Sequence, residues 1–542
     1  MILLGLHGGI TLRQHEPAAA LVINGKVAAL CEEERYLRIK SAYGYMPYYS
    51  IKACLQMANI RWEDVDLVVM PGETYVGFDD HIRQYLQHNF GSCPKIQLIH
   101  HQLAHLAVAF YSSGLDESLV LSLDASGDGD CSMLGYATRK DGIKVLEKIP
   151  ADKSLGYFYT MMTYYLGFAD GDEYKVMGLA PYGKPSIDFS AVIRPSIEGW
   201  EFDTSFLRQK PAPHSPFEHT YSEKLTKLLG QPSRLPSGEM TDYYRNVARS
   251  TQYMFEQCLL SLIKKLQRMA PASRHLCYAG GTALNCSANK ALLYSNDFDV
   301  IHVPAMSSDR GLALGCAYYG AVQMGDSPWQ LSSAYLGSSY SNDGIRKELE
   351  SNGIHFQEVD NPTEIGAQLL AEGKLLGWYQ GRSEAGARAL GNRSILASCR
   401  NKNTRDKVNK KIKYREEFRP FAPAVMFDKS EQYFQTRGRD LPNMCFTVDV
   451  KSDKADLIPA VVHQDQTARA QTVKSSDNEL FYDLLKNYYQ RTDCGVILNT
   501  SFNLKGQPIV ESPRDALMTF YGCGLDALIM GNFVVKKPVV TV

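Results

Sequence analysis

Short apolar runs separated by polar turn residues open the chain, and this pattern is typical of strands joined by tight turns. Ile2 to Leu6, Ala18 to Ile23 and Val27 to Cys31 are apolar runs of strand length. Asn24-Gly25 separates the second and third runs, and both residues tolerate the positive φ angles that a two-residue turn requires. We therefore predict a strand followed by a β-hairpin.

Two later segments predict a strand that ends in a glycine turn, Leu119 to Gly129 and Leu276 to Asn285. Between them, Thr241 to Met269 has apolar residues at helical spacing and no Gly or Pro, which predicts a long, partly buried helix. Strands and helices that alternate in this way are typical of an α/β domain, and its glycine turns are candidates for a phosphate cradle. No internal repeat is evident in the sequence.

Proline, serine and charged residues replace this pattern from about Pro195 to Pro236, with further prolines at 211, 213, 216 and 232. We predict an exposed insertion or lid there. A turn-rich run from Gly337 to Gly344 predicts the end of the first domain. The expected division is therefore residues 1–338 and residues 339–542, the second part being long enough for another α/β domain.

Composition narrows the function mainly by exclusion. The 542 residues are 44% hydrophobic and 22% charged with a formal net charge of -1, which predicts a soluble globular protein without a general attraction to nucleic acid or membrane. The start of the chain does not have the pattern of a signal peptide. Twelve scattered cysteines without a Cys-x-x-Cys pair favour reduced thiols, and we expect a cytoplasmic protein.

Two histidines spaced four apart, His101 and His105, are the first candidates for chemistry. On a helix they project from one face, and Asp124, leaving a nearby apolar strand, would complete one side of a divalent-metal site. Chance gives about 0.3 such pairs in a chain with 13 histidines, so the spacing alone is not sufficient. Asp309 is either a helix N-cap or the distal ligand, and His15 would face the same cleft.

A strongly basic segment begins the second domain. Between Arg382 and Arg419 there are 12 Lys or Arg and four Asp or Glu, where about four basic residues are expected. The arginines lie among Gly, Ala and Leu, which favours a pocket for a small phosphorylated or carboxylated ligand over a solvated face. No aromatic residue lies between Arg382 and Lys413, which argues against a nucleic-acid groove.

Downstream, Arg469 adds one guanidinium, and the segment from Asn499 to Asn503 adds amide and hydroxyl groups after an apolar strand. Such donors suit a phosphate or carbonyl oxygen, although an ordinary polar junction between strand and turn is the alternative.

Taken together, eight segments resemble the NodU/CmcH family of O-carbamoyltransferases, and their order and spacing cover nearly the whole chain. They are His15 to Leu21, Glu32 to Arg35, His101 to His105, Tyr174 to Gly183, Ala279 to Asn285, Arg388 to Ser394, Phe418 to Pro423 and Leu498 to Asn503.

The resemblance implies an actin-like, ribonuclease-H-like ATPase (ASKHA) N-terminal domain and a YrdC-like α/β C-terminal domain. It implies that carbamoyl phosphate and ATP with Mg²⁺ give carbamoyl adenylate in the second domain. The first domain then transfers the carbamoyl group to a hydroxyl of a small natural product or saccharide. The alternatives are a tRNA threonylcarbamoyl-adenosine-type enzyme, against which the near-zero net charge argues, and a catalytically silent nucleotide-binding module. We expect a small-molecule partner, neither nucleic acid nor membrane, and a homodimer as one option.

The resemblance also implies site residues. Iron(II) or another divalent metal would be held by His101, His105, Asp124 and Asp309. Carbamoyl phosphate would be bound by Arg388, Lys413, Arg419, Arg469, Asn499 and Ser501. The nucleotide would be contacted by Asp124, Gly127, Asp128, Lys175, Gly280, Gly281 and Asn285. The catalytic groups would be His15, as the base for the acceptor hydroxyl, with Asp124, Arg388, Lys413 and Arg419.

Three positions depart from the family pattern, which usually has proline at Ala387, aspartate at Glu16 and glycine at Ser308. The first departure is expected to loosen the Arg388 loop, the second to affect acceptor activation, and the third to shift Asp309.

Overall fold

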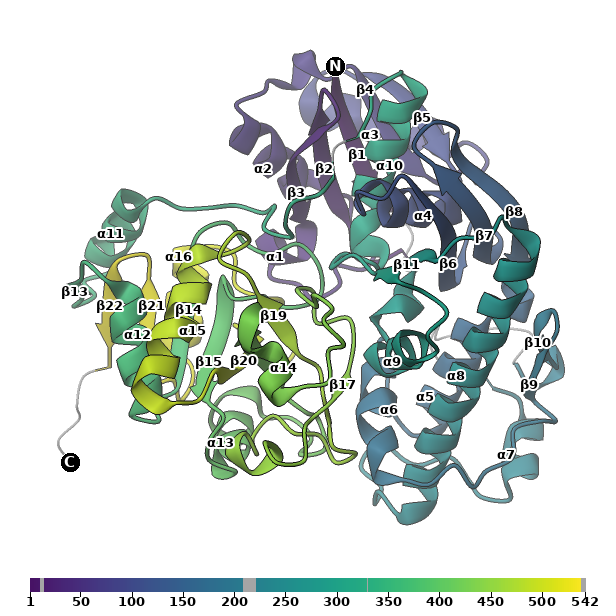
Figure 1. The fold of residues 1–542 in the computed structure, drawn as a ribbon. Coiled ribbons are helices and arrows are strands. Elements are labelled where there is room, and N and C mark those ends of the chain that lie inside the picture. The colour runs from purple at the N-terminus through teal and green to yellow at the C-terminus, as the bar shows by residue number, and fades with distance from the viewer. Residues whose placement is uncertain (10–13, 208–220, 329, 538–542) are drawn as a thin grey trace. The chain divides into compact units, whose positions relative to one another are not determined.

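The computed structural model describes residues 1–9, 14–207, 221–328 and 330–537 (Figure 1). Packing divides the chain into two compact units. Unit 1 comprises residues 1–70, 79–97 and 309–542, and unit 2 comprises residues 71–78 and 98–308. The second unit is therefore inserted within the chain of the first. The boundary at residues 338 and 339 stays a prediction.

The first sheet lies mostly in unit 1 and has the strand order β3-β2-β1-β4-β5. Its strands are β1 (Ile2–His7), β2 (Ala18–Ile23), β3 (Lys26–Glu32), β4 (Leu67–Pro71) and β5 (Lys95–Ile99). The predicted strands and hairpin are confirmed, with positive φ at Asn24 and Gly25. Unit 1 adds the helices α1 (Glu33–Leu37), α2 (Tyr48–Ala58), α3 (Phe78–Phe90) and α10 (Leu312–Gln323).

Gly5 explains how closely α10 approaches β1. A Cβ atom at Gly5 would lie 1.8 Å from the carbonyl oxygen of Ala313, so only glycine allows this contact between strand and helix. The core of this part of unit 1 therefore combines residues that precede the inserted unit in the sequence with residues that follow it.

The second sheet, in unit 2, has the strand order β12-β11-β6-β7-β8. Its strands are β6 (Glu117–Gly127), β7 (Asp130–Thr138), β8 (Gly142–Pro150), β11 (His275–Ala279) and β12 (Val300–His302). The helices of this unit are α4 (His101–Tyr111), α5 (Leu155–Tyr165), α6 (Glu173–Leu179), α7 (Glu223–Leu229), α8 (Asp242–Met269) and α9 (Cys286–Tyr294). The helix predicted from Thr241 to Met269 is confirmed as α8, which runs alongside α5 and α6 (Figure 1).

Both sheets have the same topology. In each, three successive strands form an antiparallel meander, and the first strand of the meander pairs in parallel with a later strand. Two sheets of this ribonuclease-H-like order are the architecture that the resemblance implies for the N-terminal part, so the actin-like, ASKHA-like prediction is confirmed there.

The prolines at 211, 213 and 216 lie outside the described residues. The described remainder of the predicted lid contains the hairpin of β9 (Ile193–Ser196) and β10 (Gly199–Phe202), followed later by α7. The hairpin packs on α8, and the side chains of Trp200 and Phe206 are buried. The described residues of this part are mostly exposed, as predicted, but a few buried aromatic side chains anchor it to the core.

The C-terminal part of unit 1 is built on an eight-stranded mixed sheet of order β13-β22-β21-β14-β15-β20-β16-β19. Its strands are β13 (Gln357–Glu358), β14 (Leu376–Tyr379), β15 (Arg393–Ser398), β16 (Ala422–Met426), β19 (Gln471–Val473), β20 (Val496–Ser501), β21 (Ala527–Met530) and β22 (Phe533–Lys536). A separate pair is formed by β17 (Val448–Asp449) and β18 (Thr467–Ala468). The helices are α11 (Asn342–Ser351), α12 (Pro362–Ala371), α13 (Asn403–Val408), α14 (Ser430–Tyr433), α15 (Glu479–Thr492) and α16 (Pro513–Tyr521). The C-terminal part is therefore of the α/β class, as expected, while its separation as a second domain and its YrdC-like character stay predictions.

Within the described ranges, no helix has both the length and the apolar character needed to cross a membrane.

Candidate functional site

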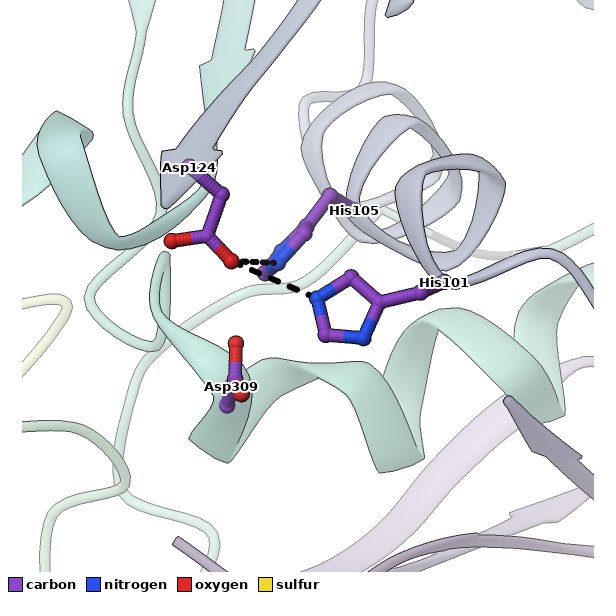
Figure 2. A group of neighbouring side chains, drawn as sticks. All are labelled: His101, His105, Asp124 and Asp309. Carbon is purple, nitrogen blue, oxygen red and sulfur yellow. Dashed lines mark hydrogen bonds and ion pairs between the residues drawn. The ribbon is translucent and has the colours of Figure 1, made fainter. Parts of the chain in front are cut away.

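The two histidines lie on the first turns of α4 and face the end of β6. Asp124 Oδ2 is 3.3 Å from His101 Nε2 and 3.6 Å from His105 Nε2 (Figure 2). The other carboxylate oxygen, Oδ1, accepts a hydrogen bond from the Gly281 N–H at 3.1 Å. One face of Asp124 is thus fixed by backbone while the other faces both imidazoles.

Asp309 follows directly on the last residue of unit 2 and begins the short turn before α10. One ligand atom from each of His101, His105, Asp124 and Asp309 lies within 4.8 Å of the others (Figure 2). Two imidazoles and two carboxylates suit a divalent ion such as Fe²⁺ or Zn²⁺, so these residues fit a metal by their donor chemistry. The alternative that Asp309 caps α10 is wrong, because Gly311 occupies that position.

Two glycines allow the site to close up. A Cβ atom at Gly127 would lie 2.2 Å from Cγ of the His101 ring, and one at Gly281 would lie 2.7 Å from Asp124 Oδ1. A larger residue at either position would therefore displace a candidate ligand side chain, the His101 imidazole or the Asp124 carboxylate. The predicted nucleotide roles of Gly127 and Gly281 are not tested by this packing.

Asp128 has its carboxylate fully engaged within unit 2. Oδ2 accepts hydrogen bonds from the N–H groups of His101 at 2.7 Å and Gly72 at 3.1 Å. Oδ1 accepts from the N–H of Thr74 at 3.2 Å and from its hydroxyl at 2.7 Å. This buried carboxylate joins the β6–β7 turn to the start of α4 and to the segment after β4. Its predicted contact with nucleotide stays a prediction.

The other nucleotide candidates also have structural partners. Lys175 on α6 lies 2.8 Å from Asp172 Oδ2, and Asn285 caps α9 by accepting from the Ala288 N–H. The Gly280 N–H donates to the Ser307 carbonyl at 2.8 Å. The predicted roles of Lys175, Gly280 and Asn285 toward nucleotide stay predictions.

His15 contacts His7, a residue that was not predicted to belong to the site. His7 Nε2 is 2.9 Å from the His15 carbonyl oxygen and 3.6 Å from Asp309 Oδ2. The only sequence signal for a role of His7 is its position at the end of an apolar strand. Glu16, with φ at 57°, forms an ion pair with the buried Arg310, so the departure at this position places a carboxylate in a charge network.

Lys413 ends a π-helical turn, Asn409–Lys413, and is buried. Its ammonium donates to the Ser501 carbonyl at 2.5 Å and to Asn503 Oδ1 at 2.7 Å, and lies 3.2 Å from Ser501 Oγ. Burial, with the nearby charges of Arg415 and Arg419, lowers the pKa of Lys413 well below its ordinary value. The structure thus brings together Lys413 and Ser501, two predicted carbamoyl phosphate ligands.

Asn499 lies on β20, two residues before Ser501. Its Nδ2 donates to Gln471 Oε1 at 2.8 Å, and Gln471 Nε2 donates to the Leu390 carbonyl at 2.7 Å. Because that carbonyl can only accept, both amide orientations are fixed. Asn499 Oδ1 is then a buried acceptor without a hydrogen-bond partner in the described parts of the chain. Gln471 is a positioning residue that no sequence signal identified.

The predicted arginines are less clearly gathered. Arg419 pairs with Glu416 at 3.6 Å, and the assignment of Arg388, Arg419 and Arg469 to carbamoyl phosphate stays a prediction. Arg382 and Arg393 have structural roles, because their guanidinium groups donate to several backbone carbonyls. Part of the basic enrichment in this segment therefore serves the fold.

Comparison with known proteins identifies the family. Residues 86–318 match the family described as "Carbamoyltransferase N-terminus", and residues 367–537 match "Carbamoyltransferase C-terminus". The nodulation protein NolNO of Sinorhizobium fredii is 33% identical over 99% of this chain and 83% of its own length. The nodulation protein NolO of Bradyrhizobium diazoefficiens is 36% identical over 81% of this chain and 78% of its own.

Solved structures are more distant. The activator of the 2-hydroxyisocaproyl-CoA dehydratase from Clostridium difficile is 16% identical, with a TM-score of 0.37, over 60% of this chain and 95% of its own. A ROK hexokinase from Thermus thermophilus has 14% identity and a TM-score of 0.30, over 59% of this chain and 100% of its own. Likenesses this weak identify no function. The two family matches and the relatives that align over most of their length identify the family: the chain belongs to the NodU/CmcH family of carbamoyltransferases.

Proposed function

We propose that the chain is an ATP-dependent O-carbamoyltransferase whose acceptor is a hydroxyl of a small natural product or saccharide. In this proposal the C-terminal, YrdC-like part makes carbamoyl adenylate from carbamoyl phosphate and ATP with Mg²⁺. The actin-like part then binds the adenylate and transfers the carbamoyl group. The acceptor is a small molecule, since the near-zero net charge gives no general attraction to nucleic acid.

The reaction balances in three steps. Carbamoyl phosphate loses its phosphoryl group to water and leaves carbamate and inorganic phosphate. A carbamate oxygen then displaces pyrophosphate from the α-phosphorus of ATP. The acceptor hydroxyl finally attacks the carbamoyl carbon, AMP leaves, and the hydroxyl proton passes to a base, for which His15 is the candidate.

The observation that carries the proposal is the pairing of a buried cation and a buried, unfilled acceptor on neighbouring backbone. Lys413 donates to Ser501 at the end of β20. Asn499 lies two residues before Ser501 on the same strand, and its Oδ1 has no hydrogen-bond partner among the described residues. An anionic phosphate suits the ammonium, and a carbamoyl NH₂ group suits the amide oxygen. Acetyl phosphate lacks that NH₂ group, so this arrangement would favour carbamoyl phosphate over it.

The metal would be held by His101, His105, Asp124 and Asp309. When bound, it would supply a positive charge for phosphate oxygens and a Lewis acid near the transferred group. The protein's own contribution is to orient these side chains, through the Gly281 N–H on Asp124 and the α4 backbone under both histidines.

Pyrophosphate release tests the activation step. The metal-loaded protein is incubated with ATP, carbamoyl phosphate or both, and we expect pyrophosphate and carbamoyl adenylate only with both. Absence of the adenylate from active-site-competent, metal-replete protein would contradict the proposal.

Two variants separate the half-reactions. Arg469→Ala should abolish adenylate formation, whereas His101→Ala should form the adenylate and impair its transfer. Wild-type behaviour of both variants would show that the residue roles are wrong.

A further inference from the structure

The motif from Glu32 to Arg35 is left without a role by the proposed function. It joins the end of β3 to the start of α1, and its four side chains are all buried. Glu33 has a local explanation, because its carboxylate accepts from the N–H groups of Tyr49 and Ser50 at the start of α2. Glu32 and Arg35 instead contact a distant segment of the same compact unit.

That segment is the loop that carries Arg388. The Gly386 N–H donates to Glu32 Oε1 at 2.5 Å, and Arg35 Nη2 donates to the Gly386 carbonyl at 3.0 Å. Both hydrogen-bonding groups of Gly386 are thus taken by the motif. The φ angle of Gly386 is 104°, which strongly favours glycine, so this backbone geometry is specific to the position.

The two motif residues are fixed relative to each other and to a third charge. Arg35 Nε lies 3.3 Å from Glu32 Oε2, and the buried Arg310 places its own Nε 3.3 Å from the same oxygen. Charges buried this deeply add little net stability, and removing one partner leaves the others uncompensated. Such a network is better suited to fixing geometry than to adding stability.

The loop is also anchored on the far side of Arg388. Glu384 Oε1 accepts hydrogen bonds from the N–H groups of Leu390, Asn392 and Arg393 at 2.7–3.0 Å. Arg388 therefore lies between two anchored stretches of backbone. The anchor before it comes from Glu32 and Arg35, more than 350 residues earlier in the chain.

We propose that Glu32 and Arg35 are positioning residues for carbamoyl phosphate, which fix the Gly386 peptide and thereby the backbone from which Arg388 reaches the ligand. The inference rests on the proposed function, in which Arg388 binds carbamoyl phosphate. A displacement of about 1 Å in a binding group costs up to about 100-fold in rate, so a released loop should weaken use of this one substrate.

The test uses the full-length protein with Glu32→Gln, Arg35→Lys and the control Glu33→Gln. Glu32→Gln keeps the shape but loses the charge that pairs both guanidinium groups. Arg35→Lys keeps a cation opposite Glu32 but loses the planar fork that also reaches Gly386. We expect the KM for carbamoyl phosphate in pyrophosphate release to rise about tenfold in both, with the KM for ATP within about twofold of wild type.

Glu33→Gln removes an equally buried carboxylate of the same motif that does not contact Gly386. It should lower the melting temperature and leave both KM values unchanged. Equal losses for ATP and carbamoyl phosphate in all three variants would indicate a merely structural motif and overturn the inference, as would an unchanged KM for carbamoyl phosphate.

Two further measurements keep the inference separate from the proposed function. Amide exchange of residues 384–393 should accelerate in Glu32→Gln and Arg35→Lys but not in Glu33→Gln, and an unchanged rate would overturn the anchoring. If wild type releases no pyrophosphate, the proposed function fails, and calorimetric binding of carbamoyl phosphate to the same proteins then decides the inference alone.

Discussion

Replacing Asp128 by asparagine should destabilise unit 2 at the N-terminus of α4. The carboxylate is 4% exposed and accepts four hydrogen bonds, two on each oxygen. Asparagine offers one acceptor oxygen, and its NH₂ group would face hydrogen-bond donors. In the best orientation the NH₂ group faces Thr74, whose N–H then loses its acceptor within the chain, while the Thr74 hydroxyl can turn to accept from the amide.

The expected magnitude follows from these contacts. Hydrogen bonds to a charged acceptor contribute about 1.5–3 kcal/mol each, and a negative charge at a helix N-terminus adds about 0.3–1 kcal/mol. Losing the charge and the bond from the Thr74 N–H should cost about 2–4 kcal/mol. For a unit of roughly 220 residues, each kcal/mol lowers the melting temperature by about 2–4 °C, so a loss of about 4–16 °C is expected.

Scanning calorimetry of the full-length protein measures the shift, and amide exchange of residues 101–111 shows whether α4 is the region affected. Asp141→Asn is the matched control, since this carboxylate of the same unit is exposed and should shift the transition by less than about 2 °C. An equally small shift for Asp128→Asn, with α4 exchange unchanged, would refute the reasoning.

Three other predictions concern one close packing contact and two buried titratable side chains. Gly127→Ala should displace the His101 ring and reduce bound metal measured by mass spectrometry, whereas Gly344→Ala, whose Cβ would meet only Ser341 Oγ at 3.5 Å, should retain it; equal metal content would contradict the packing argument. Burial lowers the pKa of Lys413, so the ammonium is lost at a lower pH than that of an exposed lysine, and the KM for carbamoyl phosphate should increase as pH rises through that pKa; a flat profile would exclude Lys413 as the anion ligand. Burial also lowers the pKa of His302 to about 4, so the unfolded chain takes up its proton first and stability should fall by about 2 kcal/mol between pH 6.5 and 4; a chemical denaturation series in which His302→Gln keeps the full loss would assign it to other groups.

The local elements were predictable because their signals are local. The Asn24-Gly25 hairpin and the long helix α8 follow from turn chemistry and periodicity over short windows. Predicting the full set of metal ligands needed the family resemblance as well. The sequence itself indicated only that His101 and His105 share a helix face and that Asp124 follows an apolar strand, which is weak evidence that they meet.

The repeated sheet topology was predictable only through the family resemblance, because a strand's pattern says which residues are buried and not which strand lies beside it. The same limit applies to side chains whose partners are distant in sequence. Arg382 and Arg393 counted as part of an anion pocket, yet they bind backbone carbonyls. Gln471 orients Asn499 across neighbouring strands of the sheet, which no short motif could indicate.

The contact between Gly5 and Ala313 also has a consequence during synthesis. The strand β1 leaves the ribosome roughly 300 residues before the helix α10 that packs on it, which at 5–20 residues per second is a delay of about 15–60 s. Unit 2, whose two segments end at residue 308, has all the residues it needs to fold only at the end of that interval, just before α10 is made. The first sheet meanwhile exposes the apolar face that α10 later covers. We therefore expect nascent chains truncated near residue 308 to bind chaperones through β1, and chains that extend beyond α10 to release them.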